Sequence, residues 1–223
     1  PKNIYLFVDG RYHIQADLEV NHDLITVVKL ATGESFLTSL LKMIPENQTL
    51  GVFSKKVSQK TFESLASKRQ IRTFENDPLD SYITENSANN VCLDVSLTGV
   101  SSDEKIRKIK TSLSDEEAFY FTDLDEVSYL FNMRNFSQSY SAKIRAKCLI
   151  SKDKTIIFSG ENLISIPEVL KNLNLKVFAD KSSISAYDYS LLKHPVELKN
   201  NPVKIMKAKK NDAELTHLKD AFE

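Results

Sequence analysis

Two carboxylates near the middle of the chain lie close enough together to do chemistry. Asp123 and Asp125 are two residues apart, a spacing at which their oxygens could share a divalent metal ion. Asp123 also stands three residues before Glu126, which is the spacing of a capping box at a helix start. Carboxylates are common at helix starts because they complement the helix dipole. We therefore interpret both aspartates as helix-start residues and predict no metal site there.

Other residues that could bind a metal or act in catalysis are scattered along the chain. The sequence has no zinc-protease motif, paired-cysteine motif, serine-hydrolase motif or glycine-rich phosphate loop. The four histidines fall on different predicted elements: His13, His22, His194 and His217. The sequence therefore predicts no catalytic residue, no metal ligand and no cofactor within this chain.

The composition is typical of a folded protein of one or two domains. The 223 residues are 41% hydrophobic and 27% charged, with 30 basic residues balancing 30 acidic ones. This balance argues against nucleic acid and membranes as partners, and no apolar run is long enough to span a bilayer. The predicted helix after Ser101 has a basic face, which we interpret as solvated: Lys105, Arg107, Lys108 and Lys110.

The two cysteines indicate a reducing compartment. Cys92 and Cys148 are far apart in sequence, and two lone cysteines make neither a disulfide framework nor a zinc site. A single disulfide between them stays open as an alternative. Cys148 begins a short apolar run and is predicted to be a buried thiol. We expect a cytoplasmic protein.

Strands and helices alternate in the first part of the chain. Strand signals cover residues 4–8, 24–30, 50–53 and 71–74, and helical signals follow Ser35 and Ser58. This alternation predicts an α/β sheet. Residues 4–8 are all apolar, which is typical of a strand buried on both faces. The alternative is a poorly protected edge strand.

The central stretch, residues 119–134, organises the second part of the chain. Three aromatic residues predict a short strand that turns into the helix capped by Asp123. Before this stretch we expect a helix after Ser101. After it we expect a hairpin over residues 146–158, a helix over 163–170 and a strand over 176–179. A helical stretch that opens at 180–183 and a last helix capped by Asn211 should follow. A Gly follows a strand at both Gly10 and Gly160, which suggests a weak internal repeat of two α/β domains.

Two ordered motifs resemble the Xaa-Pro aminopeptidases (aminopeptidase P, M24 metallopeptidase family). Residues 7–16 read F-V-D-G-R-Y-H-I-Q-A and resemble the family segment W-T-D-G-R-Y-x-x-Q-A. Residues 122–134 read T-D-L-D-E-V-S-Y-L-F-N-M-R and resemble T-x-L-D-E-I-A-W-L-F-N-L-R. Shorter likenesses occur at residues 97–101, 177–183 and 207–214. The likeness therefore runs through nearly the whole chain.

This resemblance implies two creatinase N-terminal-like domains, each a mixed sheet flanked by helices. Residues 1–80 would be the C-terminal part of domain I, which is truncated at its N-terminus, and residues 81–100 a linker. Residues 101–200 would be domain II, and residues 201–223 the lead-in and first helix of a catalytic domain that is absent. Leu215, Leu218 and Phe222 would form a stripe that awaits that domain.

The family chemistry implied by the resemblance would lie outside this chain. The parent enzyme would release the N-terminal residue preceding proline, using two divalent metal ions, usually manganese, held by the catalytic domain. The present region would shape substrate access and oligomer packing in a homodimer. Phe7 and Arg11 are the candidates for the substrate side, but we favour core packing for Phe7 and a surface or interface ion pair for Arg11. The segment from Asn135 to Lys143 departs from the family pattern, so any role of that loop is open.

Two other interpretations stay open. The chain could be a stand-alone protein-interaction module that kept a creatinase-like fold. It could also be part of a prolidase or creatinase relative, although those enzymes carry one such domain rather than two.

Overall fold

The computed structural model describes residues 3–82, 89–137 and 140–223, and it forms two compact units. Unit 1 consists of Pro1–Leu50 and Leu65–Arg72, and unit 2 of Gly51–Ser64 and Thr73–Glu223. The domain boundaries expected from the sequence divide the chain differently, and they stay a prediction. The expected linker 81–100 includes residues 83–88, and the divergent loop 135–143 includes residues 138–139, both outside the described residues.

Unit 1 is built around a pair of parallel strands. β1 (Ile4–Val8) pairs with β2 (Ile25–Lys29), and the helices of this part are α1 (His13–Glu19) and α2 (Phe36–Met43). The guanidinium of Arg69 donates to the carbonyl oxygens of Leu41 and Ile44, which lie at the end of α2. These bonds satisfy carbonyls that the helix itself leaves free.

The expectation that β1 is buried on both faces is wrong. Ile4, Tyr5 and Leu6 are 46%, 45% and 39% exposed. Among the described residues β1 pairs with β2 alone, so one edge of the strand has no partner. An apolar strand composition therefore did not guarantee burial here.

A second small sheet follows in sequence. β3 (Leu50–Phe53) pairs with β4 (Ile71–Phe74), and α3 (Gln59–Ala66) lies between them in the chain. The expected order of strands and helices is confirmed, but these four strands form two separate two-stranded sheets rather than one continuous sheet.

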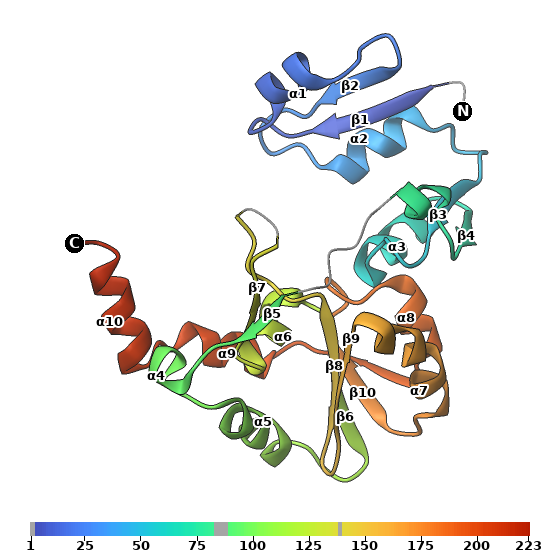
Figure 1. The fold of residues 1–223 in the computed structure, drawn as a ribbon. Helices are drawn as coiled ribbons and strands as arrows, with labels where there is room; N and C mark the ends of the chain where they lie inside the picture. The colour runs from blue at the N-terminus through green and yellow to red at the C-terminus, as the bar shows by residue number, and fades with distance from the viewer. Residues whose placement is uncertain (1–2, 83–88, 138–139) are drawn as a thin grey trace. The chain divides into compact units, whose positions relative to one another are not determined.

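Unit 2 contains a five-stranded mixed sheet with strand order β11-β10-β6-β8-β9 (Figure 1). Its strands are β6 (Glu117–Phe121), β8 (Ala146–Ser151), β9 (Thr155–Ser159), β10 (Lys176–Ala179) and β11 (His194–Glu197). β6 runs parallel to β10 and antiparallel to β8, so it lies where the sheet changes direction. β8 and β9 form the expected hairpin.

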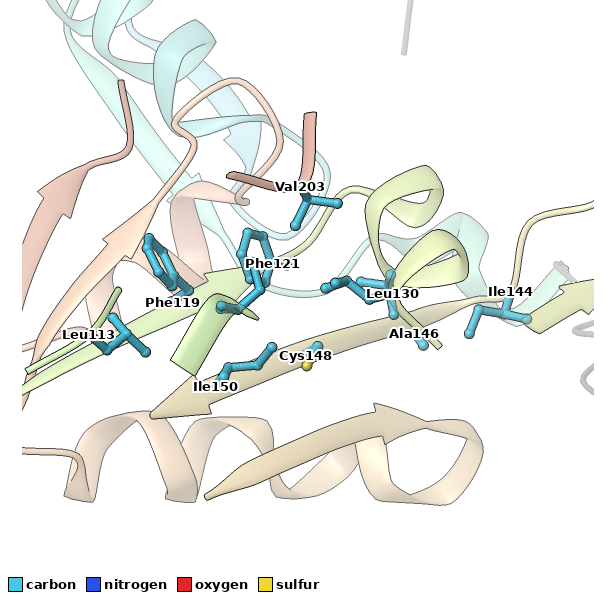
Figure 2. Close-up of a cluster of buried hydrophobic side chains, with 11 residues drawn as sticks. Leu113, Phe119, Phe121, Leu130, Ile144, Ala146, Cys148, Ile150 and Val203 are labelled. Atoms are coloured by element: carbon cyan, nitrogen blue, oxygen red, sulfur yellow. The ribbon is translucent and has the colours of Figure 1, made fainter. Parts of the chain in front are cut away.

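Both faces of this sheet carry a hydrophobic core. One core lies between the sheet and α5 (Ser102–Thr111), α6 (Leu124–Leu130) and α9 (Pro202–Ala208), and Figure 2 shows its side chains converging on β8. Cys148 lies in it, fully buried as predicted. The second core includes residues of α7 (Ile166–Asn172) and the loop before α8 (Ala186–Leu191).

Shorter elements complete unit 2. They are the 3₁₀ turns η1 (Pro78–Tyr82) and η2 (Gly160–Ser165), the antiparallel pair β5 (Asn90–Cys92) and β7 (Met133–Asn135), and the helices α4 (Val95–Thr98) and α10 (Asp212–Asp220). No helix in the described ranges has the length and apolar character needed to cross a bilayer. The structure is thus α/β, with small sheets in the first part and a mixed sheet flanked by helices in unit 2.

The three expected helix caps are confirmed. The side chains of Ser101, Asp123 and Asn211 accept hydrogen bonds from backbone amides in the first turns of α5, α6 and α10. Only Asn211 completes a capping box, because Glu214 also accepts from the Asn211 amide.

Two local expectations were wrong. The helix expected from residues 180–183 begins at Ala186, because the Asp180 carboxylate accepts from the Ser182 amide and closes a turn first. Residues 160–165 form a 3₁₀ turn rather than the start of the helix.

The suggested internal repeat does not extend to strand pairing. β9 and β1 both precede a glycine turn, but β9 is separated from β10 by β8 and β6, whereas β1 lies directly beside β2.

Helix α6 offers a matched test of the core. Leu130 is fully buried, whereas Leu124 on the same helix is 38% exposed. Leu130→Ala should lower the free energy of unfolding by about 2–5 kcal/mol, because it leaves a cavity in a close-packed core. Leu124→Ala should cost less than about 1 kcal/mol. Urea denaturation of both variants would measure this, and equal losses would contradict the burial of α6.

Candidate functional site

The two residues predicted for the substrate side lie in unit 1, on β1 and the turn after it. The Phe7 ring contacts the Phe36 ring edge to face, with centroids 5.1 Å apart. The Arg11 side chain is 80% exposed, and its Nε and Nη2 donate to the two carboxylate oxygens of Asp9 at 3.1 and 2.7 Å. The hydrogen bonds from Arg11 hold the pKa of Asp9 at about 2, well below its usual value.

This geometry leaves the Arg11 cation exposed and paired with Asp9. The forked contact with Asp9 orients the guanidinium plane, while most of the side chain faces solvent. Phe7 packs on α2 and is partly buried. The structure thus shows packing for Phe7 and an ion pair for Arg11, and a substrate-side role for either residue stays a prediction.

The carboxylates at the start of α6 have structural partners. Asp123 Oδ1 accepts from the amides of Asp125 and Glu126 at 2.8 and 3.4 Å. The carboxylate of Asp125 pairs with the ammonium of Lys143 at 2.9 Å. Glu126 is 3% exposed and accepts from Asn201 Nδ2 at 2.8 Å, and burial raises its pKa. These contacts are those of a helix start, as interpreted from the sequence.

The described residues do not fit a metal centre. Within residues 3–82, 89–137 and 140–223, no three His, Cys, Asp or Glu side chains are grouped so that they could hold an ion. Cys92 is exposed, Cys148 is buried, and both are free thiols, so the disulfide left open above does not form. Burial raises the pKa of the Cys148 thiol to about 12, which makes it unreactive at neutral pH.

A charged cleft lies beside α6 in unit 2. Its volume is about 320 Å³, and its walls come from α6, β7, the segment after residue 140, α9 and the start of α10. The charged lining residues are Asp125, Arg134, Lys143, Lys207, Lys210 and Glu214. Among the described residues, no histidine or cysteine lines the cleft, and its charged side chains could hold a charged group.

Lys105 is buried, which corrects its assignment to a solvated basic face. Lys105 is only 2% exposed. Its Nζ donates to the Asn132 side-chain oxygen at 2.6 Å and to the Tyr129 carbonyl oxygen at 2.9 Å. The ammonium also lies 3.8 Å from the centroid of the Tyr129 ring. Burial lowers the pKa of Lys105 to about 8.

A second buried polar group joins the sheet to α8. The Tyr120 hydroxyl donates to Asp188 Oδ2 at 2.9 Å, and Lys147 Nζ donates to the same oxygen at 2.6 Å. Burial and the neighbouring carboxylate raise the pKa of Tyr120 above its usual value. The partners come from β6, β8 and α8, so the contact joins three elements.

Sequence reasoning missed both groups, but a signal for one was present. Lys105 stands four residues before Ile109 and therefore lies on the apolar face of α5, not opposite it. The Tyr120–Asp188 contact joins residues far apart in the chain, and no local pattern marks it.

Comparisons with known proteins find similarity to a creatinase-like domain and to Xaa-Pro aminopeptidases. Residues 84–177 match the Creatinase/Prolidase N-terminal domain. The chain is 24% identical to "Xaa-Pro aminopeptidase 1" of Dictyostelium discoideum over 98% of its length, and 28% identical to "Probable Xaa-Pro aminopeptidase P" of Coprinopsis cinerea over 70% of it.

A solved structure shows the same fold. The X-prolyl aminopeptidase of Caenorhabditis elegans, described as a cytosolic enzyme with a di-nuclear active site, matches 98% of the chain with a TM-score of 0.82 and 18% identity. The chain spans 42% of the length of that protein and 42% of the Dictyostelium relative.

Lys105 should make stability depend on pH in a defined direction. Above about pH 8 the folded protein loses the Lys105 proton, whereas an unfolded lysine keeps it until about pH 10.4. The free energy of unfolding should therefore rise by about 2 kcal/mol between pH 8 and about pH 9.5.

The Lys105→Met variant isolates this contribution. In this variant the free energy of unfolding should no longer rise between pH 8 and about pH 9.5. The variant will also be less stable at neutral pH, because the buried Asn132 side-chain oxygen loses the ammonium that donates to it. Lys108→Met changes an exposed lysine on the same helix and should keep the rise. Denaturant titrations across this pH range would measure both, and an identical rise in Lys105→Met would refute the assignment.

Proposed function

The chain is homologous to the N-terminal, creatinase-like region of Xaa-Pro aminopeptidases, and we propose that it is the non-catalytic front part of such an enzyme. The observation that carries this proposal is how much of this chain, and how much of each relative, the alignments cover. A curated relative and a solved structure each align with 98% of the chain while the chain spans 42% of either protein. A likeness that runs end to end through this chain favours a region of an enzyme over an unrelated module.

The whole protein would release the N-terminal residue that precedes proline. Two divalent metal ions, manganese by our proposal, would polarise the scissile carbonyl and supply the attacking hydroxide. Their ligands would come from a catalytic domain, since the part of this chain that the structure describes groups no three metal-ligating side chains.

The role proposed for this region is to shape access to the active site and to take part in homodimer packing. Arg11 is the residue we propose for the substrate side, because its guanidinium is exposed and accepted by both carboxylate oxygens of Asp9. Phe7 lies on the adjoining strand and would support that end of β1. We further propose a cytoplasmic location, in keeping with the free cysteines and the cytosolic relative.

The size and activity of the native protein test this proposal. An antibody against the chain should detect a protein more than twice as large as the 223 residues, since the chain spans 42% of its relatives. The whole protein, but not the isolated chain, should release the residue before proline from a peptide in the presence of manganese. A native band at the size of the chain would favour the stand-alone interaction module, and release by the pure chain would refute a non-catalytic role.

Arg11 can be tested in the whole protein. If it contacts substrate, Arg11→Ala should lower kcat/KM by about tenfold or more, the loss expected for one hydrogen bond to a charged group. Arg107→Ala removes an exposed arginine from α5 and should leave kcat/KM unchanged. Equal kcat/KM values for the two variants would contradict a substrate-side role for Arg11 and leave it only the ion pair with Asp9.

A further inference from the structure

Helix α10, near the end of unit 2, contributes no buried residue to the core. No residue of α10 is buried, and Leu215, Leu218 and Phe222 are 44%, 45% and 90% exposed. Figure 1 shows α10 extending away from the sheet with its first turn beside α4. Burial in the core therefore contributes little to the direction of α10.

The cap residue of α10 bonds in two directions at once. Asn211 Oδ1 accepts from the Glu214 amide at 3.0 Å, which caps the helix. Its other side-chain atom, Nδ2, donates to the carbonyl oxygen of Thr98 at 2.9 Å, at the end of α4. One side chain thus joins the start of α10 to the end of α4.

Gly99 makes this approach possible. It ends α4 with φ 70°, a conformation that costs glycine little. A Cβ on this residue would lie 2.6 Å from Asn211 Cγ, far inside van der Waals contact. A side chain at residue 99 would therefore displace Asn211.

The end of α4 is itself held from the core side. Asn132 Nδ2 donates to Thr98 Oγ1 at 3.1 Å and to the Val100 carbonyl oxygen at 2.9 Å. Asn132 Oδ1 in turn accepts from the buried Lys105 ammonium. Asn132 Nδ2 thus donates once to Thr98 in α4 and once to Val100, two residues after it, which uses both of its amide hydrogens.

We propose that this polar chain is a conformational latch that fixes the direction in which α10 leaves unit 2. The latch comprises Lys105, Asn132, Thr98 and Asn211, with Gly99 as the steric opening. Each link is a hydrogen bond between elements rather than within one, since the four residues come from α5, the α6–β7 turn, α4 and the start of α10. A cap alone would stabilise α10 as a helix but would leave its direction free.

The Asn211→Asp variant separates capping from latching. Aspartate caps a helix as well as asparagine does, so α10 should stay helical. Its carboxylate cannot donate to the Thr98 carbonyl and would repel that oxygen, so the latch should open. Asn200→Asp makes the same chemical change at an exposed residue and serves as the control.

Backbone ¹⁵N relaxation on the purified 223-residue chain would measure the effect. In the unmodified chain and in Asn200→Asp, α10 amides should have order parameters near those of the sheet, about 0.85. In Asn211→Asp they should fall below about 0.6 while the α-carbon shifts of α10 remain helical. Gly99→Ala should produce the same loosening, because it displaces Asn211.

Three outcomes would overturn the latch. One is an α10 that is as rigid in Asn211→Asp as in the control. Another is an α10 that is already mobile in the unmodified chain. The third is a loss of order spread equally over α10 and β6, which would make these bonds part of general stability rather than a device for one helix.

Discussion

Strand β6 has to be buried on both faces, and most of unit 2 is arranged to meet that requirement. Ala118 and Tyr120 lie in one core, and Phe119 and Phe121 lie in the other. A strand of this kind needs neighbours on both edges and helices on both sides, since every exposed aromatic would lose the free energy of burial. The hairpin β8–β9, strand β10 and the surrounding helices supply those neighbours.

Burying so much of the unit forces its polar groups to find partners inside the protein. The Tyr120 hydroxyl, the Lys105 ammonium and the Glu126 carboxylate each lie where water is scarce, and each bonds to a group on another element. Without a partner, each buried group would destabilise the fold by more free energy than an ordinary hydrogen bond contributes. These contacts therefore specify how α5, α6, α8 and α9 sit on the sheet, beyond what apolar packing requires.

Local signals in the sequence predicted much of unit 2 and less of unit 1. Caps such as Ser101 and Asp123 depend on residues three apart, and the apolar strands of the hairpin depend on composition, so both could be read directly. The exposure of β1 and the Tyr120–Asp188 contact depend on which elements meet, which no short window records. The same reason limits how much of the candidate site could be predicted. Arg11 could be named from a motif, whereas the residues that line the cleft beside α6 come from five separate segments.

The change of strand direction at β6 has a consequence for synthesis. Its antiparallel partner β8 follows soon in the sequence, but its parallel partner β10 is made much later, with Phe119 pairing with Phe178. A chain emerging from the ribosome can close the near edge of β6 at once, whereas the far edge must wait. Until β10 arrives, an aromatic strand presents free amides and carbonyls to the surroundings. During this interval the open edge of β6 could pair with a strand of another chain.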